Sequence, residues 1–170
     1  IIDFGAHLFP SATFPEPIAD GAVRDILGDR MHDPEQLLKL YKAAGISNAA
    51  LSQPFYMGHN DADAVAAAND ALLEIIEAYE QFYGLAAIPV SAGGPAAAEE
   101  FERALEAGFN GGALETETNG VDLTDGSLEP VFEVAERTGA PILVHPKLHQ
   151  SLHPDALSDE WRLNAIFGRE

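Results

Sequence analysis

The sequence predicts an α/β fold, in which strands and helices alternate along the chain. Five short runs are continuously apolar, as expected for strands that are covered on both faces of a parallel sheet. Stretches with apolar residues at helical spacing lie between these runs, and their ends carry capping residues. The strand starts are separated by roughly 27 to 47 residues, which is the size of βα units.

The expected strands, in order, are residues 1–9, 48–55, 82–90, 109–115 and 141–145. The expected helices are residues 34–44, 62–80, 95–107 and 128–138, with a last one that starts near Ser158. The first helix has Asp33 as its N-cap and Pro34 at its first position, and Gly45 follows its end. The third and fourth helices end at Gly108 and Gly139.

Two folds use this alternation, the eight-stranded (β/α)8 TIM barrel and the open doubly wound sheet. No glycine-rich phosphate-binding motif follows an expected strand, which weakens the nucleotide-binding version of the open sheet. A complete barrel has about 250 residues, so 170 residues hold about five of its eight βα units. We therefore interpret residues 1–170 as the N-terminal part of a single (β/α) barrel domain.

The composition excludes several classes of function. The chain has no cysteine, so it forms no disulfide and has neither a thiolate metal site nor a cysteine nucleophile. No apolar run approaches the roughly 20 residues of a membrane-spanning helix, and the first residues have no signal-peptide pattern. We therefore expect a cytoplasmic protein without a membrane partner.

The charge is strongly acidic. Nine basic and 28 acidic residues give a net charge of −19, and the acids are scattered along the chain. This composition resembles that of halophilic proteins, in which salt screens the repulsion within a hydrated acidic surface. An ordinary acidic cytosolic protein is the alternative interpretation. No basic patch is present, so nucleic acid is not an expected partner.

Two histidines stand where expected strands end. His7 follows the apolar start of the first strand, and His145 ends the fifth. The first and fifth strands of an eight-stranded barrel face each other, so their carboxyl ends bring these side chains together over the barrel mouth. Neutral imidazoles are ordinary zinc ligands, and the pair predicts a metal site. The alternatives are a hydrogen-bonded core histidine for His7 and a strand-end histidine bonded to a carbonyl for His145.

A metal site needs more than two ligands. A third would come from Glu115 at the end of the fourth strand, from His149, or from chain beyond residue 170. Asp3 lies four residues before His7, so strict alternation puts both on one face and makes Asp3 a candidate to orient an imidazole. A solvated acid at Glu115 and a backbone-bonded carboxylate at Asp3 are the alternatives.

Three further residues are candidates for a substrate pocket at the same end of the strands. Gln53 lies at the end of the second strand, His59 follows that strand, and His149 follows the fifth. A surface position is the alternative for each histidine. No histidine stands near Ser52 in the sequence pattern, so the sequence predicts no Ser-His-Asp arrangement.

The order of several motifs resembles a known family. Asp3-Phe4-Gly5-Ala6-His7-Leu8-Phe9-Pro10 resembles the Asp-x-His-x-His-x-x-Pro opening of the amidohydrolase superfamily. Matching motifs follow in the family's order over nearly the whole chain: Asn69-Asp70, Phe82 to Pro89, Gly108 to Gly112, and Val144-His145-Pro146. The resemblance is to the amidohydrolase-related group that includes aminocarboxymuconate-semialdehyde decarboxylase and γ-resorcylate decarboxylase.

The resemblance implies a TIM barrel of the metal-dependent hydrolase type with one divalent metal, often zinc. His7 matches the second histidine of the first-strand pair, and His145 matches the fifth-strand ligand. Gly5 stands at the first position of the pair and offers no donor atom.

The implied function is that of a metal-dependent hydrolase or non-oxidative decarboxylase acting on a small carboxylic acid, either alone or as a homo-oligomer. The alternative is a non-catalytic relative, a binding or scaffold protein whose metal site has degraded at Gly5.

Overall fold

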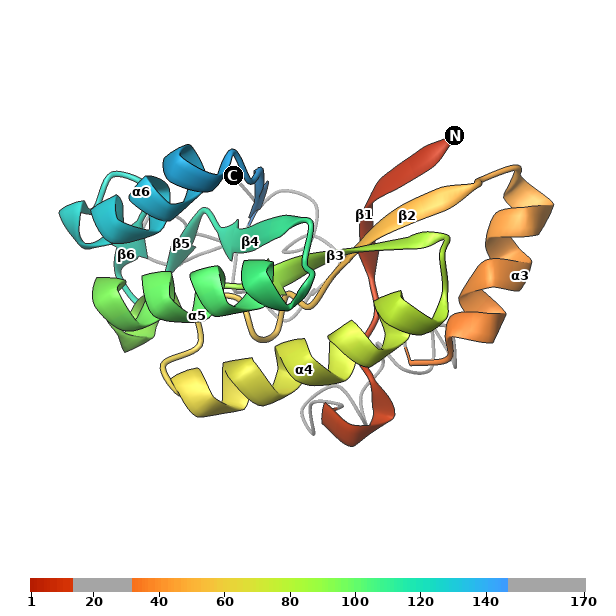
Figure 1. Cartoon of the computed structure of the whole chain (residues 1–170), viewed down its shortest axis with the longest axis horizontal. Helices are drawn as coiled ribbons and strands as arrows, with labels where there is room; N and C mark the ends of the chain where they lie inside the picture. Colours follow the sequence, from red (N-terminus) through yellow and green to blue (C-terminus); the bar gives the residue numbers. More distant parts are fainter. Residues whose placement is uncertain (14–31, 147–170) are drawn as a thin grey trace, which may run out of the picture.

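A parallel five-stranded sheet with helices packed on one face forms the centre of the molecule (Figure 1). The structure is a computed structural model, and it describes residues 1–13 and 32–146. The strand order is β1-β2-β3-β4-β7, and every neighbouring pair is parallel. Between β4 and α6 the chain forms a small antiparallel pair, β5-β6.

The strands are β1 (Ile2–His7), β2 (Asn48–Ser52), β3 (Phe82–Ala87), β4 (Gly111–Glu115), β5 (Glu117–Thr118), β6 (Val121–Asp122) and β7 (Ile142–His145). The α-helices are α3 (Pro34–Ala44), α4 (Ala62–Ala78), α5 (Gly94–Ala107) and α6 (Glu129–Thr138). Short 3-10 turns are η1 (Ser11–Thr13), η3 (Val90–Ala92) and η4 (Gly126–Leu128).

All five predicted strands and four of the predicted helices are present, and the fifth predicted helix, near Ser158, lies outside the described residues. Three strands end earlier than expected, the first of them at His7. The second stops at Ser52, just before a turn that contains Pro54, and the third stops at Ala87, before the turn at Val90. Proline has no N–H to continue a ladder, which accounts for the shorter second strand.

The first predicted helix begins and ends at the residues that the sequence indicated. Asp33 accepts hydrogen bonds from the N–H groups of Glu35 and Gln36 at 2.9 and 3.2 Å. At the other end Gly45 adopts a φ of 71°, a left-handed conformation that glycine reaches without steric cost.

The sheet has an outer face, covered by helices, and an inner face. Residues paired across parallel strands point to the same face, and the faces alternate along each strand. Leu51 and Leu114 lie on the outer face, in two buried clusters formed with residues of α3 and α4 and of α5 and α6. Ala50, Leu85 and Ala113 lie on the inner face in a third cluster.

The outer layer is closely packed around β4. An added Cβ at Gly112 would lie 2.7 Å from both Phe101 of α5 and Ile88. Phe101 is itself fully buried. Glycine at this position therefore lets α5 approach the sheet, and α5 lies between α4 and α6 as Figure 1 shows.

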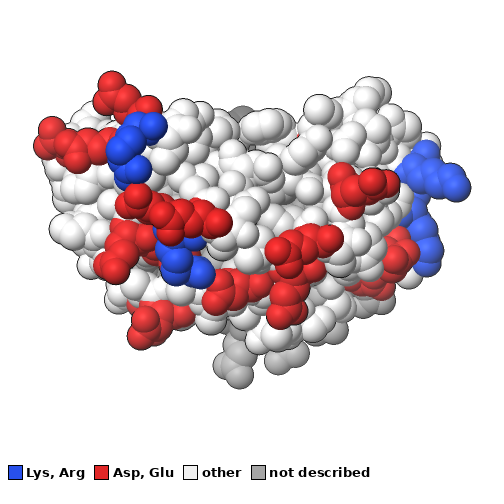
Figure 2. Space-filling model, in the orientation of Figure 1, with Lys and Arg blue, Asp and Glu red and all other residues white. Residues whose placement is uncertain are grey.

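Acidic side chains outnumber basic ones on the outer surface. Figure 2 shows acidic side chains spread over the face that carries α4 and α5, with few basic side chains among them. In the described ranges, none of the helices is both long enough and apolar enough to cross a membrane.

Candidate metal and substrate site

The two strand-end histidines meet. The ring centroids of His7 and His145 are 5.1 Å apart, with 66° between the ring planes. His7 ends β1 and His145 ends β7, and these strands are the two ends of the five-strand order. Their rings come together because the sheet curls, as a half-barrel does. The predicted convergence of His7 and His145 is confirmed, and their role as metal ligands stays a prediction.

Both rings lie on the inner face. Ala6 pairs with Leu51 of the outer cluster, so the next pair, His7 with Ser52, points inward. At the other edge Leu143 belongs to the inner cluster, and His145 lies two residues further along β7. Alternation therefore places His145 on the same face.

Glu115 also lies on the inner face. It is the direct partner of His145 in the β4–β7 register. The Thr118 hydroxyl of the β5-β6 hairpin donates to Glu115 Oε2 at 2.6 Å and so orients this carboxylate. Of the two possible strand registers, the structure has the one that puts Glu115 beside the histidines.

Ser52 is a site residue that the sequence analysis missed. Its Oγ lies 3.1 Å from Nδ1 of His7, and its side chain is fully buried. A hydrogen bond at Nδ1 fixes the ring and directs Nε2 away from β2. The β1–β2 register supplies this contact, and a signal for it exists only once those two strands are known to end together.

Asp3 does not share a face with His7, contrary to the expectation from strict alternation. The β1–β2 register shifts between Asp3 and Ala6, so β1 has one extra residue there. Asp3 pairs with Ala49 on the outer face, where Tyr41 of α3 donates to its Oδ2 at 2.9 Å.

The contacts of Asp3 indicate a structural role. The Gly5 N–H donates to Asp3 Oδ1 at 3.0 Å, across the extra residue. Burial, followed by the hydrogen bond to Asp3, raises the pKa of the Tyr41 phenol. The structure therefore fits the backbone-bonded alternative for Asp3 and gives it no contact with the histidines.

The backbone at Gly5 has open space around it. An added Cβ at Gly5 would meet no atom of the described residues within 4 Å. Gly5 stands two residues before His7, within the segment between Asp3 and Ala6 where the β1–β2 register shifts, so simple alternation does not assign its face. The missing donor at this position is thus accompanied by open space and not by a filled core.

Gln53 does not reach the inner face. It follows Ser52, so it points to the opposite side, where its Nε2 donates to the carbonyl of Ala68 in α4 at 2.9 Å. The side chain is fully buried, and its Oε1 has no hydrogen-bond partner in the part of the chain that the structure describes. A substrate role for Gln53 is therefore not supported by its position.

His59 lies in the β2–α4 loop, near the carboxyl ends of the strands. Its Nδ1 accepts from the Asp61 N–H at 3.2 Å, and its ring lies 6.3 Å from the rings of both Phe55 and Tyr56. The Tyr56 hydroxyl donates to the carbonyl of Thr13 at 2.6 Å, which joins this loop to the segment after β1. His59 remains a candidate pocket residue.

The remaining candidate, His149, lies outside the described residues. Within residues 1–13 and 32–146, no group of three or more His, Cys, Asp or Glu side chains is arranged to hold a metal ion. The described site therefore offers two converging imidazoles with Glu115 nearby.

Comparison with known proteins agrees with this architecture. The amidohydrolase family profile matches residues 2–167, and the chain belongs to that family. Over 79 residues, which are 46% of this chain and 22% of the other protein, it is 33% identical to 2-amino-3-carboxymuconate-6-semialdehyde decarboxylase from Dictyostelium discoideum.

Solved structures show the same fold. 5-Carboxyvanillate decarboxylase from Sphingomonas paucimobilis is 24% identical and has a TM-score of 0.76, with 99% of this chain and 58% of that chain covered. A 5-carboxyvanillate decarboxylase from Novosphingobium aromaticivorans, with bound manganese and 3-methoxy-4-hydroxy-5-nitrobenzoic acid, is 20% identical with a TM-score of 0.74, and the match covers 91% of this chain and 54% of that chain. The chain thus spans about half the length of these relatives, and its five parallel strands form a partial TIM barrel.

Proposed function

We propose that this chain contributes to a metal-dependent decarboxylase or hydrolase that acts on a small carboxylic acid. The observation that carries the proposal is the 5.1 Å distance between the His7 and His145 ring centroids, on the inner face at the carboxyl ends of the strands. Membership of the amidohydrolase family supports the reaction class. The manganese and the substituted benzoic acid in one structural relative support a divalent metal and an aromatic acid substrate.

The distance between the rings fits two ligands of one ion. With a metal–nitrogen bond of about 2.1 Å, each ring centroid lies about 3.2 Å from the metal, and tetrahedral ligands then have centroids about 5.2 Å apart. His7 and His145 are 5.1 Å apart. His7, oriented by Ser52, and His145 would hold the ion, and Glu115, the register partner of His145, is a candidate for a third position.

The ion would act as a Lewis acid, polarising a carboxylate or carbonyl group of the substrate. The residues of this chain have other tasks in the proposal. Ser52 keeps the His7 ring in one orientation, and the β2–α4 loop with His59 borders the substrate. We propose zinc as the metal, with manganese as the alternative taken from the relative.

The wider setting is also proposed. We infer a salt-adapted protein from the net charge of −19, and we propose a cytoplasmic location and a single barrel domain of which residues 1–170 are the N-terminal part. A homo-oligomer is compatible with this arrangement. Neither nucleic acid nor a membrane is a proposed partner.

Metal binding by the complete protein tests the proposal. Titration with Zn²⁺ or Mn²⁺ should give about one bound equivalent in the wild-type protein, and His7→Ala and His145→Ala should each abolish tight binding. Ser47→Ala is the control, since Ser47 donates to the Ile1 carbonyl at 2.9 Å, at the opposite end of β1 and β2 from the histidines, and should not affect binding. Wild-type binding well below one equivalent would contradict the metal site.

Carbon dioxide release from 5-carboxyvanillate, measured with the metal-loaded protein, tests the reaction. Release that requires His7 and His145 supports a decarboxylase. Hydrolysis of an amide or ester without carbon dioxide release supports the hydrolase version.

Gly5 favours a second candidate, a non-catalytic relative that serves as a binding or scaffold protein. The open space around Gly5 makes Gly5→His a sterically permitted test. A large gain in metal affinity with no catalytic turnover in the wild-type protein would support the degraded site. Unchanged affinity would show that another group already fills the position.

A further inference from the structure

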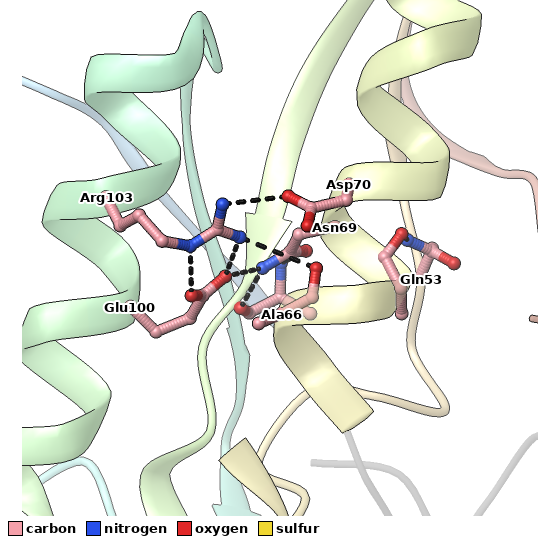
Figure 3. A network of polar contacts seen from close by, with 8 residues as sticks. Gln53, Ala66, Asn69, Asp70, Glu100 and Arg103 are labelled. Carbon is pink, nitrogen blue, oxygen red and sulfur yellow. Dashed lines mark hydrogen bonds and ion pairs between the residues drawn. The ribbon is translucent and has the colours of Figure 1, made fainter. Parts of the chain in front are cut away.

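A buried polar network joins α4, β3 and α5 (Figure 3). At its centre is Asn69 of α4, whose side chain is fully buried. Its Oδ1 accepts from the Ala87 N–H at 2.9 Å, and its Nδ2 donates to the Ala87 carbonyl at 3.1 Å and to Glu100 Oε1 at 2.7 Å. Both donors of the amide and one acceptor are therefore used.

The Asn69 side chain pairs with the backbone of Ala87 where a neighbouring strand would otherwise do so. The last register pair between β2 and β3 is Leu51 with Gly84, and β2 ends at Ser52. Ala87, the last residue of β3, extends beyond β2 and its backbone would lose its partner there. Because a buried backbone group without a partner is costly, the two-point contact from Asn69 stabilises the carboxyl end of β3.

Glu100 and Arg103 hold Asn69 in this orientation. Glu100 is 6% exposed, and Arg103 donates to it from Nε at 2.7 Å and from Nη2 at 2.9 Å. A second branch of the guanidinium donates to Asp70 at 2.8 Å. A two-pronged contact of this kind fixes the carboxylate and compensates its buried charge.

The network continues to the end of the sheet that carries the histidines. Ile88 follows Ala87, and its N–H donates to the Ala113 carbonyl at 3.1 Å. The Ile88 carbonyl accepts from the Gly58 N–H at 2.8 Å. Gly58 belongs to the β2–α4 loop that also carries His59, and it has a φ of 71°. The position of this loop therefore depends on where β3 ends.

We propose that Asn69 is a positioning residue for the candidate site, and that Glu100 and Arg103 keep it in place. Through Ala87 and Ile88 it sets the position of the β2–α4 loop at the mouth of the barrel. The catalytic consequence depends on the proposed function, because it requires this loop to border the substrate. The structural consequence, a fixed position for Gly58, does not depend on the proposed function.

Arg103→Met in the complete protein tests the proposal, since it keeps an aliphatic side chain and removes the guanidinium. We expect hydrogen exchange at the Ala87 and Gly58 amides to become about tenfold faster, the equivalent of one lost hydrogen bond. With 5-carboxyvanillate, KM should rise severalfold, while kcat and the Mn²⁺ affinity change little.

Arg137→Met is the matched control. Arg137 of α6 makes an exposed ion pair with Glu102 of α5, at 2.9 Å, and has no contact with Asn69 or Glu100 among the interactions of the described residues. This variant should leave both amides and KM unchanged. Arg103→Lys keeps the charge that compensates Glu100 but loses the planar fork, so it should give the same pattern to a smaller degree if Arg103→Met fails to fold.

Wild-type exchange at Gly58 in both Arg103 variants would overturn the proposal. Equal acceleration in the Arg137→Met control would also overturn it, because the effect would then be general. If no turnover is found with the wild-type protein, the proposed function fails, while the exchange measurement still decides whether the network around Asn69 fixes Gly58.

Discussion

The contact between Ser52 and His7 leads to a sharp prediction for Ser52→Ala. Ser52 Oγ is 3.1 Å from Nδ1 of His7 and is fully buried, so water does not replace it. Removing a residue that orients a metal-bound histidine typically lowers metal affinity about 10- to 100-fold. We expect a loss in this range, about 1.4–2.7 kcal/mol of binding free energy.

The same substitution should affect folding only moderately. One lost neutral hydrogen bond costs about 1 kcal/mol. For a chain of this size that corresponds to a fall in Tm of about 2–4 °C. The effect on metal affinity should therefore exceed the effect on stability.

Isothermal titration with Mn²⁺ and a thermal melt of the metal-free protein measure the two effects. Ser47→Ala is the control, because Ser47 donates to the Ile1 carbonyl at 2.9 Å, at the opposite end of the same two strands. A Ser52→Ala affinity equal to that of the control would refute the argument that Ser52 orients His7.

Three further predictions concern stability. Tyr41→Phe should destabilise the fold by about 1–2 kcal/mol near neutral pH through its lost bond to Asp3. Burial and the Asp3 contact raise the pKa of Tyr41, so its stabilisation is present below the unfolded pKa of about 10 and is lost as the pH rises above it. Urea titrations at increasing pH should show a smaller decline in the variant than in the wild type, since Tyr56 and Tyr79, whose pKa values are also raised, remain in both.

Gly112→Ala should cost about 1–3 kcal/mol because its Cβ would lie 2.7 Å from Phe101, whereas Gly126→Ala, which meets no atom within 4 Å, should be close to neutral in the same titration. Finally, Tm should rise when KCl is raised from about 0.1 to about 2 M, since screening reduces repulsion within the acidic surface. A Tm that falls or stays constant would contradict salt adaptation.

Much of the fold follows from local patterns. The apolar runs and the capping residues, such as Asp33 and Gly45, depend on interactions within a few residues, so the sequence displays them directly. The meeting of His7 and His145 was predictable from strand order alone, because the first and fifth strands of a barrel face each other.

The rest of the site depends on interactions between distant segments. The extra residue in β1 that turns Asp3 outward has no sequence mark beyond Gly5, and it reverses the result of simple alternation. Ser52 reaches His7 only through the register of two strands. Strands as short as β5 and β6 contain too few residues for a periodic pattern.

The extra residue in β1 also determines which side chains of the strand point to the inner face and which to the outer face. The stretch before it is anchored to α3 through Asp3 and Tyr41, and the stretch after it presents His7 inward. Deleting one residue at positions 4–5 would leave a chain of nearly identical composition, but it would force either Asp3 into the barrel or His7 among the helices. Length variation in this strand is thus expected to be far less tolerated than substitution.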